Sequence, residues 1–207
     1  MAINLGPADA ENVAQFWKNI LDDPIPQNAM NDNNGNLWVR AQGGNPDILY
    51  FAGNDRQNHN RRNIPPVPPG KRLFVAVNPV EVTDFEVEAE AVPDKDLANN
   101  SRRDEDSASK ADLIINNQRI DLIARGYRCA NGNFQINAPP AGTLWGIPNG
   151  SHPCAADGYY TIIEPLDPGD YTMEIDAQVD KPFPFKQSVA WTSKVIYKFR
   201  VVGPPPQ

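Results

Sequence analysis

The sequence contains few of the residues that most often carry catalysis and metal binding. Among 207 residues there are only two cysteines and two histidines, His59 and His152. A structural zinc site takes about four ligands from cysteine, histidine or carboxylate side chains. The fixed motifs of nucleotide-binding proteins, zinc proteases and serine hydrolases do not occur either. The sequence therefore predicts a protein that is not an enzyme and holds no cofactor, apart from a possible calcium ion.

Long apolar runs and an excess of basic residues are also missing. No stretch approaches the ~18 apolar residues of a membrane span, and no signal peptide is visible in this chain. Lys and Arg number 19 against 26 Asp and Glu, a net charge of −7. Nucleic-acid-binding proteins need a basic face that displaces counterions. These absences predict neither membrane insertion nor a nucleic-acid partner.

The negative charge is concentrated in residues 81–106. This segment holds ten acidic and three basic residues, and the rest of the chain is neutral. Apolar and acidic residues alternate from Val80 to Val92, which predicts a strand with one wet face and a bulge or bend at Thr83-Asp84. That face serves solubility and edge protection, or alternatively binds a cation or a charged partner. The weak metal-ligand candidates are Glu86, Glu88, Asp104 and Asp106.

One helix is expected, from Ala8 to Asp22, with an apolar stripe of period 3.6 and Asp9 as its cap. The rest of the chain reads as about ten short strands with frequent turn signals. We predict a mainly β protein: an antiparallel, jelly-roll-like β-sandwich with one short N-terminal amphipathic helix. It forms a single domain over residues 1–207, with a flexible tail at 203–207.

Several local signals are specific enough to be checked. Asn116-Asn117 suits the two-residue turn of a hairpin over 113–123, because both turn positions take positive φ. Residues 64–70 contain four prolines and read as an extended connection that cannot pair. A long loop is expected from Ala138 to Pro153. Further strands are predicted at 37–41, 47–52, 71–78, 134–137, 158–164, 171–179 and 191–202.

The two cysteines, Cys129 and Cys154, both lie among turn-forming residues. Pairing them would stabilise the fold by roughly 3–4 kcal/mol in the chain-entropy model. We predict this disulfide, with two free thiols as the alternative.

Residues 155–175 read Ala-Ala-Asp-Gly-Tyr-Tyr, then Pro-Leu-Asp-Pro-Gly-Asp-Tyr-Thr after four residues. This pattern resembles a motif of uncharacterised exported proteins of bacteria and archaea, and the resemblance extends in order over residues 8–179. That family has no established activity. The resemblance therefore implies an exported, β-rich fold and assigns no catalytic residue.

Three functions follow from these features. The first is a non-catalytic extracellular or cell-surface protein that serves structure, assembly or adhesion, through self-assembly or a cell-surface partner. The second is a carbohydrate-binding module, because exposed aromatic rings stack on sugars. The third is a glycoside or ester hydrolase with paired carboxylates. The candidate ligand-binding residues are Trp145, Asp157, Tyr159 and Tyr160.

Overall fold

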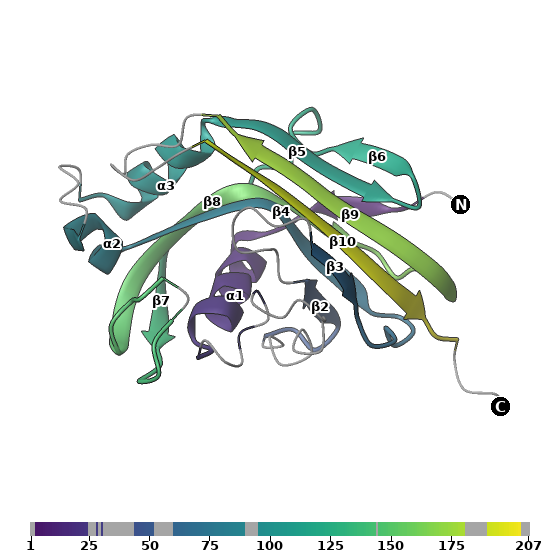
Figure 1. The fold of residues 1–207 in the computed structure, drawn as a ribbon, viewed down its shortest axis with the longest axis horizontal. Coiled ribbons are helices and arrows are strands. Elements are labelled where there is room, and N and C mark those ends of the chain that lie inside the picture. Colours follow the sequence, from purple (N-terminus) through teal and green to yellow (C-terminus); the bar gives the residue numbers. More distant parts are fainter. Residues whose placement is uncertain are drawn as a thin grey trace.

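The protein is mainly β, with its strands arranged in two five-stranded sheets (Figure 1). Sheet A contains β1 (Leu5–Pro7), β8 (Gly150–Ile163), β4 (Arg72–Thr83), β2 (Ile48–Phe51) and β7 (Asn131–Ala138). Sheet B contains β3 (Asn60–Asn63), β10 (Trp191–Val201), β9 (Gly169–Val179), β5 (Ala108–Ile115) and β6 (Gln118–Asp121). Neighbouring strands are antiparallel except β2 with β4 and β3 with β10. The computed structural model describes residues 3–24, 28, 30, 44–51, 60–89, 95–143, 145–180 and 190–203.

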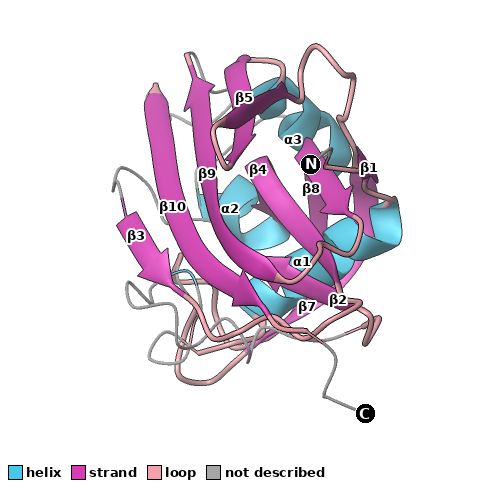
Figure 2. Cartoon of the chain, turned by 90° about the vertical axis from the view of Figure 1, so that its right-hand side faces the viewer, coloured by secondary structure: helices cyan, strands magenta, loops and turns pink. Residues whose placement is uncertain are grey.

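Sheet A lies between a helix on one face and sheet B on the other (Figures 1 and 2). Successive side chains of a strand point to opposite faces, and β4 shows the result. Phe74 and Ala76 join the core cluster around α1 (Ala10–Leu21). Leu73 and Val75 join a second cluster that includes buried residues of β5, β9 and β10. Both faces of the sheet therefore carry a hydrophobic core.

The predicted N-terminal helix is confirmed as α1. Asp9 caps it, because its carboxylate accepts hydrogen bonds from the backbone N–H and the side chain of Asn12. The apolar stripe is almost fully buried against sheet A and includes Phe16 and Trp17, whose rings pack edge to face. Two polar side chains are buried as well: Tyr50 of β2 donates a hydrogen bond to Asn12.

The strand predicted over Val80–Val92 is wrong at Asp84–Ala89, and its last three residues lie outside the described part of the chain. Residues Asp84–Ala89 form a short helix, α2. The Thr83 hydroxyl accepts a hydrogen bond from the backbone N–H of Glu86, and the Glu86 carboxylate accepts hydrogen bonds from Thr83 in return. This reciprocal capping box satisfies backbone donors at the start of a helix. The Thr-x-x-Glu sequence therefore ends the strand that the alternation predicted.

A further helix and the predicted hairpin turn follow in this part of the chain. Residues Leu97–Glu105 form α3, with Asp96 as its cap. The hairpin of β5 and β6 turns at Asn116 and Asn117, whose φ angles are 47° and 68°.

The loop predicted from Ala138 to Pro153 is too long, because β8 begins at Gly150. Pro153 pairs with Gln135 of β7 on one side, while β4 ends opposite Cys154 on the other. Proline is tolerated where a strand lacks a neighbour on one side, since its missing N–H then leaves no ladder bond unmade. Residues 64–70 also depart from the prediction: the backbone N–H groups of Ile64 and Val67 donate to carbonyls of β10. The strand predicted at 37–41 and the tail beyond Gly203 lie outside the described residues.

Candidate functional site

The predicted disulfide is absent, and Cys129 and Cys154 are free thiols. The two cysteines lie at different heights along β8, which explains why they do not pair. The backbone N–H of Cys129 donates to the carbonyl of Gly158, four residues along β8 from Cys154. Four strand residues span roughly 13 Å, whereas a disulfide needs Cα atoms within about 7 Å. Burial raises the pKa of both thiols, which makes them poor nucleophiles.

The four candidate ligand-binding residues lie on two different faces of sheet A. Tyr160 is fully buried on the α1 face, where its hydroxyl accepts a hydrogen bond from the indole N–H of Trp17 and donates to the Asp157 carbonyl. The half-buried Trp145 packs against Trp17 on the same face. Asp157 and Tyr159 alternate with Tyr160 and so face the opposite way. These residues do not form one aromatic platform.

We expect Trp145→Ala to lower the stability of the protein by about 1–3 kcal/mol. The reason is that the indole covers Trp17, whose own ring is buried in the α1 cluster. Urea unfolding followed by tryptophan fluorescence measures this change. A glycan array run on the same variant tests the sugar-binding alternative: loss of a glycan signal without loss of stability would contradict a packing role.

Acidic side chains of residues 81–106 serve the fold in several different ways. Glu86 closes the capping box and Asp96 caps α3. Asp84 contacts His152 Nδ1 at 2.9 Å, and Asp106 binds Arg128 at 2.6 Å. The candidate metal ligands Glu86 and Glu88 belong to α2, whereas Asp104 and Asp106 lie at the end of α3. Within the described part of the chain, no three His, Cys, Asp or Glu side chains come together as metal ligands.

Asp157 and Arg128 form the most developed polar cluster of the described structure. The guanidinium donates from Nε and Nη2 to the two carboxylate oxygens of Asp157, at 2.9 and 2.8 Å. The Asp157 side chain is 4% exposed and that of Arg128 29%. The same guanidinium reaches Asp106 and the carbonyl of Arg102. Hydrogen bonding to Asp157 raises the pKa of Arg128 further above its usual range, so Arg128 stays charged.

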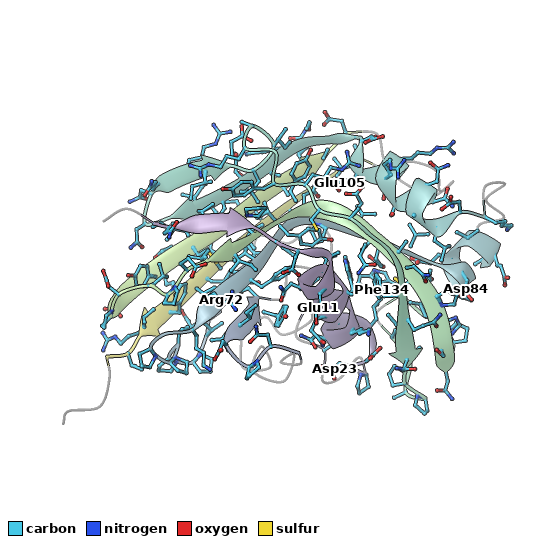
Figure 3. All side chains as sticks on the ribbon, turned by 180° about the vertical axis from the view of Figure 1, so that it is seen from behind. Glu11, Asp23, Arg72, Asp84, Glu105 and Phe134 are labelled. Carbon is cyan, nitrogen blue, oxygen red and sulfur yellow. The ribbon has the colours of Figure 1, made fainter. Side chains whose placement is uncertain are left out.

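Glu105, labelled in Figure 3, is 1% exposed, and the charges of both Asp157 and Arg128 act on it. No described group makes a hydrogen bond to either of its carboxyl oxygens. Burial, and then the negative charge of Asp157, raise its pKa well above the ordinary value for glutamate. A neutral acid beside an ionised one is the arrangement that glycosidases use. Here, however, neither carboxyl group reaches the surface, so a substrate cannot touch them in this conformation.

Sequence reasoning found Asp157 but not its partners. Arg128 and Glu105 come from a loop and a helix that are far from Asp157 in sequence, and tertiary packing alone brings them together. One local signal was available: Glu105 lies in a run of charged residues, Arg102 to Asp106, and a helix with one buried face must bury one of them.

Comparison of the chain with models of protein families, with curated proteins and with solved structures gave no match. Among the described residues, no helix combines the length and the apolar character that crossing a membrane requires.

Proposed function

We propose that the protein is a non-catalytic extracellular or cell-surface protein that serves structure, assembly or adhesion. The observation that carries this proposal is β7, an edge strand of sheet A that has no charged residue. The side chains that could take part in a reaction support the same view. Arg128 and Asp157 join α3 to β8, and the cysteines are buried or half-buried.

A β-sandwich of the jelly-roll kind is the architecture that we propose for it. Buried residues of both sheets share one hydrophobic cluster, as in two sheets packed face to face. The outer face of sheet B is polar and carries ion pairs between β9 and its neighbours, such as Lys110–Asp176 and Lys194–Glu174. A wet outer face and a dry inner face are the usual pattern of such a sandwich.

Strand β7 has eight residues, Asn-Gly-Asn-Phe-Gln-Ile-Asn-Ala, and none is charged. Within the described residues it pairs only with β8 (Figure 1). Exposed edges of this kind add strands from other chains, and proteins that avoid such pairing place lysine or proline there. The edge strand β6 of sheet B differs, because it carries Arg119 and Asp121.

Part of the β7 edge is covered, in one place by the end of helix α1 and in another by a side chain of β7 itself. The backbone N–H of Asn137 donates to the Asp22 carboxylate, and that of Asn133 donates to the Asn131 side chain. Because alternate N–H groups of a strand point the same way, the N–H of Gln135 also points outward. Gln135 is exposed and lies midway between the two covered positions.

We expect the protein to self-associate as its concentration rises, and Gln135→Lys to raise the concentration needed by about tenfold or more. In this variant, pairing of two β7 edges would bring the two new lysine charges together, and they repel each other. Gln118→Lys is the matched control, since it makes the same change on the edge strand β6. Sedimentation velocity with and without calcium measures both. A protein that stays monomeric at high concentration, or equal effects of the two substitutions, would overturn assembly through β7.

A further inference from the structure

The side chain of Arg128 joins helix α3 to sheet A. Arg128 contacts the end of the helix at the Arg102 carbonyl and the Asp106 carboxylate, and contacts β8 at Asp157. The remaining docking contacts of α3 include an apolar one, where Leu97 packs on Val80 and Val82 of β4. The helix also buries Asn100, Ser101 and Glu105.

Glu105 is the last residue of this helix, and its two carboxyl oxygens are buried without a hydrogen bond to any described group. An ionised carboxylate at this position would lack hydrogen bonds and would lie close to the charge of Asp157, which costs several kcal/mol. Arg128 is the positive charge that acts on Glu105 most strongly among the described residues. Its hydrogen bonds, however, go to Asp157, Asp106 and the Arg102 carbonyl, and Glu105 receives none from a described group.

We propose that α3 is a proton-gated clamp: it stays docked on β4 and β8 while Glu105 carries a proton, and it releases when Glu105 loses that proton. Release moves the carboxylate into water and frees Arg128 from the helix. The face of sheet A that holds Asp157, Tyr159, Val80 and Val82 then becomes accessible. This device goes beyond the proposed assembly function and does not depend on it.

Most of the charged and titratable groups around Glu105 agree with this direction, and the opposing charge of Arg128 lowers the pKa of Glu105 by less than burial and Asp157 raise it. On β8, Asp157 repels an ionised Glu105, and the Tyr159 hydroxyl is itself kept neutral by burial and by Glu105. On the helix side, Asp104 and Asp106 also disfavour the ionised form. Strand β4 turns valines toward α3, and its Glu81 pairs in register with Ala156, a residue of the α1 cluster on the other face. Strand β7 contains no titratable residue.

The sign of the pH effect follows from linkage. Glu105 has a higher pKa in the docked state than when exposed to water, so the docked state holds its proton more tightly. Docking is strongest below the ordinary pKa of glutamate, about 4.3. Above it, the open fraction rises by up to about tenfold per pH unit until Glu105 ionises in the docked state as well.

Trypsin cleavage at Arg102 and Arg103 measures this opening, because both residues lie in α3 and a protease needs the helix unfolded or released. The rate in the wild type is divided by the rate in Glu105→Gln at each pH across roughly pH 6 to 9, which cancels the pH dependence of the protease itself. We expect the ratio to rise by up to about tenfold per pH unit and then level off. Glu88→Gln, the same change at an exposed glutamate, should behave like the wild type.

A ratio that does not change with pH would overturn the proposal, as would an equal effect of Glu88→Gln. A second measurement needs no variant. Carbon-13 NMR of the wild type reports the protonation of the Glu105 carboxyl carbon directly, and the resonances of α3 should shift together with it. A Glu105 that is already ionised at pH 6, with α3 still docked, would also overturn the clamp.

Discussion

Gly158→Ala should destabilise the protein by about 3–5 kcal/mol, a large part of the total stability expected of a single domain. Gly158 lies in β8 opposite Pro79 of β4, next to the register shift between Ala76 and Asn78. A Cβ atom there would lie 2.5 Å from the Asn78 carbonyl oxygen and 3.0 Å from the Pro79 Cα. Both are backbone atoms of the central strand pair, so relief of the clash requires β4 and β8 to separate.

Two costs add up in this variant. Overpacking of a well-filled core costs about 1–3 kcal/mol, and the φ of +156° at Gly158 is unfavourable for alanine by a further 1–3 kcal/mol or so. The ring of Tyr160 is the third close neighbour, at 2.9 Å, and it is held by hydrogen bonds to Trp17 and Asp157. It therefore cannot turn aside cheaply.

Urea unfolding of Gly158→Ala beside Gly169→Ala tests this. Gly169 begins β9, and a Cβ atom there meets only the Tyr171 ring at 3.8 Å, an ordinary contact. The control should change stability by no more than about 0.5 kcal/mol. Equal midpoints for the two variants would contradict the close approach of β4 and β8. The test also gives the Asp-Gly-Tyr-Tyr segment a physical role: at its glycine, β4 leaves no room for a Cβ atom on β8.

Local sequence signals predicted the elements that depend least on contacts with distant parts of the chain. The stripe of α1, the cap at Asp9 and the turn at Asn116-Asn117 are set by residues within one or two turns of chain, and all three were found. The end of β4 was also readable, since Thr83 and Glu86 form a capping box, but the alternation of acids and valines favoured a strand instead. A cap decides such a conflict because it satisfies backbone donors that a strand would pair elsewhere.

The polar cluster could not be predicted in the same way. Arg128 reaches Asp157 because residues 127–129 lie along β8, where Arg128 bridges Tyr159 and the Cys129 N–H donates to Gly158. No residue near Arg128 in sequence predicts how residues 127–129 align with β8. Strand alternation does predict that Tyr159 and Tyr160 lie on opposite faces of the sheet. It does not predict that both faces are covered by other parts of the fold, which is what keeps either ring from serving as a binding surface. That covering depends on α1 and sheet B.

Arg128→Met should cost about 3–5 kcal/mol at neutral pH, because it leaves the buried Asp157 carboxylate with the Gly158 N–H as its one remaining donor among the described groups. Methionine keeps much of the stem that packs on the fold but none of the five donors. The end of α3 loses its contacts through Asp106 and the Arg102 carbonyl as well. Urea unfolding gives the loss in stability, and faster trypsin cleavage at Arg102 and Arg103 reports the loosened helix.

The chain provides a matched control, because Arg200 binds Asp170 through the same two guanidinium nitrogens, at 2.7 and 2.9 Å. Geometry is therefore nearly equal in the two pairs, while exposure differs: Arg200 and Asp170 are 66% and 71% exposed. An ion pair in water contributes about 1 kcal/mol or less, so Arg200→Met should be nearly silent. A double-mutant cycle of Arg128→Met with Asp157→Asn separates the pair itself from the stranded charge. We expect the double variant to be more stable than the sum of the single losses predicts, by about 1–3 kcal/mol. Strict additivity would mean that Arg128 contributes through its packing and its contacts to α3, and that burial does not strengthen its bond to Asp157.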